Sequence, residues 1–114
     1  MTVYISIPIT GLDLYTQRTN AAEVAELISS HGHEPVNPFD SPEPPADLSE
    51  RERYAYFMGE DIKQLLMCDA ILMCAGWPFS KGCRMELSAA YSQRLKIYYS
   101  EKEFIRANNG KEEI

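Results

Sequence analysis

The sequence predicts an α/β fold in which a parallel β-sheet carries helices on both faces. Short apolar runs bounded by turn residues, which are typical of buried strands, alternate along the 114 residues with longer segments of helical periodicity. Right-handed crossovers join such elements, so the strands pair in parallel and the helices cover both faces. We therefore expect one domain, residues 1–114, built on a doubly wound, flavodoxin- or Rossmann-like sheet of four to five strands.

The first strand and the first helix are predicted near the N-terminus. Residues 2–6 form an apolar run of strand type that ends before Pro8 and Gly11. Over residues 18–31, apolar side chains recur at helical spacing, and Gly32 follows as a C-terminal stop. The helical positions are Ala21, Val24, Ala25 and Ile28.

Residues 33–37 form a short second strand, which Pro35 places at the edge of the sheet because proline lacks the N–H that a central strand donates. Residues 38–47 contain four of the seven prolines and are predicted to be a long surface loop. Loops of this length include binding segments and plain surface excursions about equally often.

Ser49 and Glu52 have the spacing of a capping box and predict a second helix that runs to about Met67. Residues 70–74 are uninterruptedly apolar, as in a strand covered on both faces, and are predicted to be the central strand. A third helix follows over residues 80–93.

The last predicted elements are a strand over residues 95–99 and a short helix. Ser100 and Glu103 repeat the capping-box spacing at the start of that helix. Residues 108–114 are a polar tail.

Composition excludes several classes of function. A net charge of −6, without a run of basic residues, disfavours a nucleic-acid polymer as partner, although a helix N-terminus can still bind a small anion. No segment approaches the length of a membrane span, and the N-terminus has the pattern of a strand and lacks that of a signal peptide. Three cysteines without CxxC spacing favour a reducing, cytoplasmic location over disulfides or zinc.

In a doubly wound sheet, ligands bind beyond the carboxyl ends of the strands. The loops that follow the strands are therefore the first candidates, including residues 8–11 and 76–82. Ser80 and Gly82 begin the third helix, where free N–H groups attract a phosphate or carboxylate. The plainer interpretation is that Ser80 is an N-cap and Gly82 a turn residue.

Glu86 lies about one and a half turns into the same helix, so its side chain can lean towards the helix N-terminus. It is either a solvated helix residue or a functional carboxylate, and its apolar neighbours favour the second. Asp61 is a second candidate acid, equally compatible with a surface position, whereas Asp69 is expected to cap the corner between helix and strand.

Aromatic and thiol side chains add further candidates. Tyr4 is most simply a core residue of the first strand, and Tyr54, Tyr56 and Trp77 are either core residues or stack on a base. Cys83, near a helix N-terminus, is an alternative nucleophile if its thiol pKa is lowered. The two histidines, His31 and His33, lie at the end of the first helix and the start of the second strand, which argues against a Cys-His pair with Cys83.

Three segments together resemble the nucleoside 2-deoxyribosyltransferase superfamily, and in particular its small bacterial and phage branch of the DUF4406 type. They read YISIPITG (residues 4–11), GEDIKQLLMCDAILM (59–73) and WPFSKGCRMELSAAYSQ (77–93). The resemblance covers about the first hundred residues. One departure is Ile7, where the family's first motif usually has glycine, and its branched side chain restricts close approach to the backbone.

The resemblance implies that Glu86 is the nucleophile at the sugar C1′, that Asp61 binds or protonates the base and that Tyr4 orients Glu86. At position 80, where this sequence has serine, it resembles the branch of the superfamily that hydrolyses deoxynucleoside 5′-monophosphates. The resemblance also implies a homodimer or larger homo-oligomer. Two carboxylates suffice for glycosidic chemistry, so no metal or cofactor is expected.

The sequence thus predicts a small-molecule nucleoside or nucleotide as ligand. The phosphate is expected at Ser80 and Gly82 with the loop formed by Ile9, Thr10 and Gly11. Pro8 and Trp77 are further candidates for binding the substrate. Three functions stay open at this point: an N-glycosidase, a deoxyribosyltransferase that exchanges bases, and a non-catalytic nucleotide-binding module.

Overall fold

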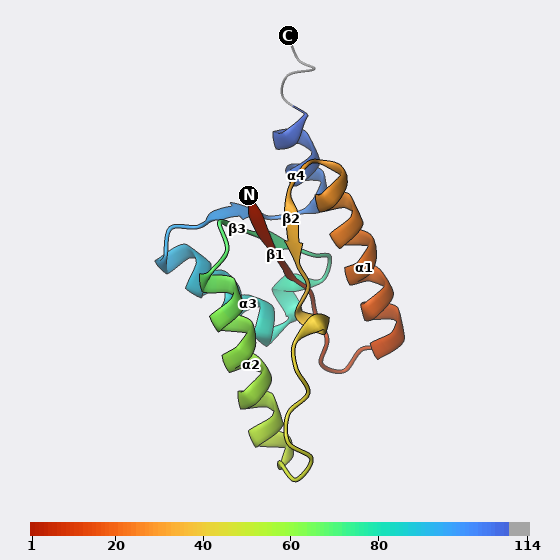
Figure 1. Cartoon of the computed structure of the whole chain (residues 1–114), viewed down its shortest axis with the longest axis vertical. Helices are drawn as coiled ribbons and strands as arrows, with labels where there is room; N and C mark the ends of the chain where they lie inside the picture. Colours follow the sequence, from red (N-terminus) through yellow and green to blue (C-terminus); the bar gives the residue numbers. More distant parts are fainter. Residues whose placement is uncertain (110–114) are drawn as a thin grey trace.

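The computed structural model describes residues 1–109, and these form four parallel strands flanked by helices (Figure 1). The elements in chain order are β1 (Thr2–Ser6), α1 (Leu14–Ser30), β2 (Glu34–Val36), the 3-10 helix η1 (Pro38–Asp40), α2 (Glu50–Leu66), β3 (Ala70–Met73), the 3-10 helix η2 (Trp77–Phe79), α3 (Lys81–Ser92), β4 (Lys96–Tyr98) and α4 (Glu101–Asn108). Residues 110–114 of the predicted tail lie outside the described residues.

The strands lie in the order β2-β1-β3-β4, and every neighbouring pair is parallel. This confirms the α/β fold class, the edge position of β2 and the central position of β3. The carboxyl ends of β1 and β3 meet where Ser6 pairs with Met73. Loops that leave these strands therefore emerge side by side at one edge of the sheet.

Each face of the sheet is covered by two helices, and Figure 1 shows α1 and α2 on opposite sides of the strands. On one face, Val3 and Ile5 of β1 pack with α1 and with Phe104 of α4. On the other, Tyr4 packs with Leu65 of α2 and Cys83 of α3. Alternate residues of β1 thus enter different cores.

Several predicted boundaries were wrong. Helix α1 begins at Leu14 instead of residue 18, because Asp13 caps it by accepting a hydrogen bond of 2.9 Å from the N–H of Thr16. Strand β2 covers three residues instead of five. The predicted loop contains η1, which Asn37 caps by accepting from the N–H of Phe39. The capping boxes at Ser49 and Ser100 mark their helices as expected, although only the first is reciprocal.

Candidate active site

A cavity of about 650 Å³ opens at the carboxyl edge of the sheet. Its walls come from five parts of the chain. These are the loop after β1, the start of α1, η1 with the segment that follows it, the N-terminal two thirds of α2, and the start of α3. Its lining residues include Ile7, Ile9, Thr10, Asp61, Ser80, Gly82, Cys83 and Glu86. The structure therefore brings together, around one space, residues that are 79 positions apart in the sequence, from Ile7 to Glu86.

Glu86 is 5% exposed and receives two hydrogen bonds from β1. The hydroxyl of Tyr4 donates to Oε2 over 2.8 Å, and the hydroxyl of Ser6 donates to Oε1 over 2.7 Å. Tyr4 and Ser6 are two residues apart, so both point to the same face of the strand. The carboxylate is thereby fixed in orientation between the sheet and the cavity.

Burial raises the pKa of Glu86 from its usual 4.5 to about 7. The hydrogen bond from Ser6 opposes this rise, the negative charge of Asp61 adds to it, and the hydrogen bond from Tyr4 opposes it again. The pKa of the Tyr4 hydroxyl is itself raised by burial and by both carboxylates, so Tyr4 acts only as a donor. Glu86 therefore changes its charge near neutral pH.

Asp61 lies on α2, is 8% exposed and lines the same cavity. Its Oδ1 atom is buried and has no hydrogen-bond partner among the described residues. Burial, with a smaller contribution from Glu60, raises its pKa from 3.8 to about 7. A buried carboxyl oxygen without a partner is costly, and a ligand atom in the cavity is a natural partner for it.

The start of α3 supplies the third feature of the cavity. The hydroxyl oxygen of Ser80 caps the helix by accepting from the N–H of Cys83 over 3.2 Å, as the plainer interpretation expected. A hydroxyl that accepts through its oxygen retains its own proton for a further acceptor. The cap and an anion-binding role are therefore compatible at Ser80.

The loop after β1 is held by a residue that the sequence analysis did not select. Gln17 of α1 is buried, and its side-chain amide donates to the carbonyl oxygen of Pro8 over 2.6 Å. Ile7, which stands where glycine is usual, is 6% exposed and lines the cavity. Pro8 and Gly11 belong to this loop, but they do not line the cavity.

Trp77 does not line the cavity either. It packs on the core between the sheet and α3, with its ring 6.1 Å from that of Tyr99. Of the other aromatic candidates, Tyr54 lines the cavity, whereas Tyr56 lies with its ring 5.7 Å from that of Phe57.

The other predicted polar candidates have structural surroundings. The carboxylate of Asp69 accepts from the backbone N–H and the hydroxyl of Thr2, which ties the start of β3 to β1. The Cys83 thiol is buried and its pKa is raised by that burial, so the lowered pKa required of a thiol nucleophile is not found. His33 bonds instead to Asn108, on the α4 side of the sheet.

Ser6 is a second residue, besides Gln17, that sequence reasoning missed. The sequence contained the information needed to find it. Ser6 is two residues from Tyr4, so both side chains lie on the same face of the strand, and Ser6 is the last residue of that strand, next to the edge where ligands bind. A polar residue at a buried strand position calls for a partner.

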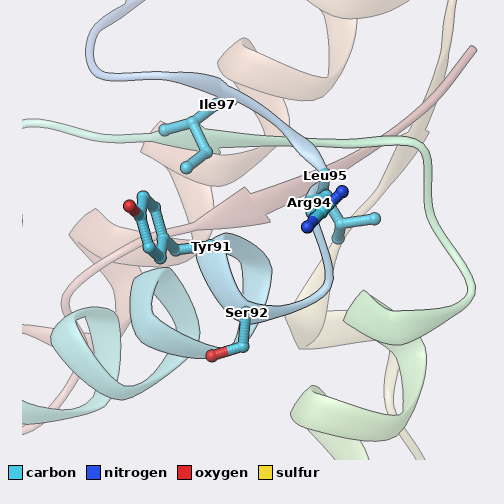
Figure 2. Close-up of a pocket in the computed structure, with 5 residues that line it drawn as sticks. All are labelled: Tyr91, Ser92, Arg94, Leu95 and Ile97. Carbon is cyan, nitrogen blue, oxygen red and sulfur yellow. The ribbon is translucent and has the colours of Figure 1, made fainter.

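A second hollow, of about 560 Å³, lies at the other end of α3 (Figure 2). Figure 2 shows Tyr91 and Ser92 from the end of α3, Leu95 from the chain that leads into β4, and Ile97 from β4 itself. Arg94 completes it and has a positive φ of 58° where the chain turns. None of its lining residues is an acid, so it lacks the paired carboxylates of the cavity at the carboxyl edge.

Among the described residues, no three His, Cys, Asp or Glu side chains gather in a way that could hold a metal ion. No helix of the described part is long and apolar enough to cross a membrane.

Comparison with solved structures shows this fold in several proteins, among them the following three. A 2-deoxyribosyltransferase from Bacillus psychrosaccharolyticus has a TM-score of 0.66 and 16% identity, over 88% of this chain and 72% of that one. A 2-deoxyribosyltransferase from Leishmania mexicana has a TM-score of 0.63 and 20% identity, over 87% and 63%. The CMP N-glycosidase BcmB of Clostridium botulinum has a TM-score of 0.51 and 18% identity, over 85% and 66%.

The match thus spans about two thirds of the length of these proteins. Comparison with curated proteins gives no match. The model of a family described as a domain of unknown function, DUF4406, matches residues 1–99.

Proposed function

Because the chain belongs to the DUF4406 family, a member of the nucleoside 2-deoxyribosyltransferase superfamily, we propose that it cleaves the N-glycosidic bond of a nucleotide, with Glu86 as nucleophile. The proposed substrate is a (deoxy)nucleoside 5′-monophosphate and the proposed reaction is hydrolysis. One observation carries the proposal: the Glu86 carboxylate is buried, held by Tyr4 and Ser6, and borders a cavity that it shares with Asp61.

In the first step, a Glu86 oxygen attacks C1′ and the C1′–N bond breaks. The electron pair of that bond leaves with the base, and positive charge develops on the sugar. A carboxylate fixed beside the sugar stabilises this charge and then captures C1′ as an ester. The two hydrogen bonds from Tyr4 and Ser6 hold both Glu86 oxygens in place during the attack.

Asp61 is proposed to protonate the departing base. With a pKa of about 7, a large fraction of Asp61 is protonated at neutral pH. The residue lines the cavity, and its buried Oδ1 has no hydrogen-bond partner among the described residues. In the second step, water attacks C1′ and gives its proton to Asp61, which releases free sugar phosphate and restores the Glu86 carboxylate. If a second base attacks instead, the reaction is transfer.

Ser6 is proposed as a positioning residue that acts through Glu86. Its hydrogen bond favours the charged carboxylate and so keeps the Glu86 pKa from rising further. It does not line the cavity and is not expected to touch the substrate.

The 5′-phosphate is proposed to lie at the start of α3, where Ser80 donates its hydroxyl proton and the backbone at Gly82 faces the cavity. Ile9 and Thr10 line the same cavity and are proposed as further contacts of the phosphate. Replacing Ser80 with Asp places a charge against the phosphate. It is expected to weaken nucleotide use much more than nucleoside use, and equal effects would refute a phosphate role for Ser80.

The experiment that tests the reaction is base release from a panel of nucleosides and nucleotides by the parent and by Glu86→Gln. We expect Glu86→Gln to lose at least about 1000-fold in rate. The matched control is Glu23→Gln, an exposed residue of α1 away from the cavity, which should retain the parent rate. Addition of a second free base to the same assay distinguishes hydrolysis from base exchange.

A non-catalytic nucleotide-binding module is the second candidate, and the position of Ile7 favours it. The branched side chain occupies part of the cavity wall where glycine leaves room for the ligand. Binding of a nucleotide by both the parent and Glu86→Gln, without base release by either, is the result that identifies a module.

We also propose that the chain forms a homodimer or larger homo-oligomer that covers the mouth of the cavity. Apolar side chains are exposed around this mouth, among them Phe79 at 91% and Leu14 at 49%, and Tyr15 beside Leu14 is 79% exposed. Exposed apolar patches of this kind mark interaction sites. Light scattering should give a multiple of 13.0 kDa, and Phe79→Ser should shift the mass towards the monomer.

A cytoplasmic location is proposed on the cysteines. All three are free and buried, which suits a compartment where thiols stay reduced.

A further inference from the structure

Three basic side chains from three different helices line the cavity that holds Glu86. They are Arg18 of α1, Arg53 of α2 and Lys81 of α3. The chain has only eleven basic residues and a net charge of −6. Three carboxylates also line this cavity, those of Glu43, Asp61 and Glu86, so the basic residues favour an anionic occupant only in the part of the cavity where they gather.

Each of the three cations lies over an aromatic ring that also lines the cavity. The guanidinium carbon of Arg18 is 4.9 Å from the centre of the Phe39 ring, and that of Arg53 is 5.9 Å from the centre of the Phe57 ring. The ammonium nitrogen of Lys81 is 5.8 Å from the centre of the Tyr54 ring. A ring face attracts a cation through its quadrupole and offers no strong hydrogen-bond acceptor, so most of the N–H donors remain available to a ligand.

No carboxylate neutralises these cations among residues 1–109. The ion pair found there within 4.0 Å joins Lys63 to Glu60, away from the cavity. Glu43 lines the cavity but makes no such pair with a described basic residue. Unpaired cations beside a cavity are held ready for an anion that arrives from solution.

The cations lie towards the outer part of the cavity and the catalytic acids towards its inner part. Along α2, Arg53 precedes Asp61 by eight residues, which is about 12 Å of helix. Along α3, Lys81 precedes Glu86 by five residues, about 8 Å. The Lys81 contact with Tyr54 joins the outer parts of these two helices into one wall.

We infer that this outer wall binds the second and third phosphates of a nucleoside 5′-di- or triphosphate. The inference rests on the proposed function for the position of the sugar at Glu86 and of the first phosphate at Ser80. A single phosphate at Ser80 is within the reach of Lys81, but it leaves Arg53, two helical turns beyond Asp61, without a partner. We expect a phosphate chain that runs outwards from Ser80 to meet Lys81 and then Arg53, while Arg18 of α1 lines the same cavity.

The test measures binding, so that it does not depend on turnover. Isothermal titration calorimetry with Glu86→Gln compares nucleosides carrying zero, one, two and three 5′-phosphates, for each of the four common deoxynucleosides. We expect the triphosphate of the preferred base to bind at least about tenfold more tightly than the monophosphate. Equal or tighter binding of the monophosphate, or no binding of any member, overturns the inference.

The arginine is tested in the same background with Arg53→Ala. We expect about tenfold weaker binding of the triphosphate and less than about twofold change for the unphosphorylated nucleoside. The matched control is Arg51→Ala, an exposed arginine of the same helix outside the cavity. Equal losses from Arg53→Ala and Arg51→Ala contradict the subsite, because they indicate a general charge effect.

Turnover by the parent separates this inference from the proposed function. If base release depends on Glu86 but additional phosphates do not favour it, the glycosidase proposal is supported and the phosphate-chain subsite is contradicted. Binding of the triphosphate through Arg53 without base release from any nucleotide leaves the subsite standing and removes the glycosidase.

Discussion

The two faces of β1 differ in chemistry although they belong to one strand of five residues. On the α1 and α4 side, Val3 and Ile5 belong to a cluster of apolar side chains that includes Ile28 and Phe104. On the α2 and α3 side, Tyr4 and Ser6 direct hydroxyls at a buried carboxylate. One face is built as a core and the other carries the candidate site.

The difference shows which part of the molecule stabilises the fold and which part costs stability. Apolar burial is favourable at roughly 25 cal/mol per Å². A buried carboxylate is unfavourable when charged, and the raised pKa values of Glu86 and Asp61 record that cost. Retention of two such groups beside one cavity is what a functional site requires, and a purely structural core gains nothing from it.

The largest expected change in stability is on the apolar face. Ile28→Ala removes a fully buried side chain from α1 and should lower the free energy of unfolding by about 2–5 kcal/mol. Urea denaturation measures this loss, and base release per folded molecule should stay at the parent value. A loss of turnover in the folded fraction would mean that the two faces do not act separately.

The pH dependence of stability tests the polar face. Glu86 has a pKa of about 7 when folded and near 4.5 when unfolded, so between these values the folded state binds more protons. Stability is therefore greatest at low pH within this window and falls as the pH rises from about 4.5 to about 7. The loss from Glu86 alone is about 3 kcal/mol, and Asp61 changes in the same direction.

Urea unfolding at pH 5 and pH 8 measures this loss, with Glu86→Gln as the control. The groups whose pKa is lowered in the folded state, Asp13, Glu52 and Asp69, are already charged at pH 5 and contribute little to the difference. The pH dependence should be smaller in Glu86→Gln. An unchanged dependence in that variant contradicts the raised pKa of Glu86.

Tyr4→Phe removes one of the two donors to Glu86 without changing the apolar contacts of the ring. The charged carboxylate then loses a hydrogen bond of 2.8 Å, so its pKa rises and its orientation loosens. We expect kcat/KM at pH 7 to fall about 10- to 100-fold, with partial recovery at pH 8.5. A fall that is equal at both pH values indicates that Tyr4 acts without changing the ionisation of Glu86.

Ser6→Ala is expected to have the smallest effect of the four. Loss of its hydrogen bond should move the rising limb of the pH profile of kcat/KM to higher pH by up to about one unit. Ser6→Thr, which keeps a hydroxyl, should restore the parent profile in part. If KM changes and the pH profile does not, Ser6 contacts the substrate and our assignment as a positioning residue is wrong.

Much of the fold followed from local patterns in the sequence. The apolar run of β3 and the proline of β2 correctly gave the central and edge strands, because burial and missing donors act within a few residues. The start of α1 was missed because its cap, Asp13, stands before a turn in which Leu14 and Tyr15 are exposed and give no apolar signal.

The site was less predictable because it is assembled from distant segments. The helical position of Glu86 suggested function, but its partners are 80 and 82 residues away, and no local pattern reports such pairing. Trp77 was equally compatible with base stacking and with the core, and in the structure it lies on η2 and packs against the core. The cations of the cavity wall, Arg18 and Arg53, lie on amphipathic helices where arginine is common, so sequence alone does not single them out.

The most direct test of the central claim is the mass of the protein when turnover is stopped with acid. If Glu86 captures C1′, a fraction of the chain should gain the mass of the sugar phosphate, and the modified peptide should be the one that contains Glu86. Glu86→Gln should show no such gain. Base release at the parent rate by Glu86→Gln, or an adduct on another residue, would contradict the assignment of Glu86 as nucleophile.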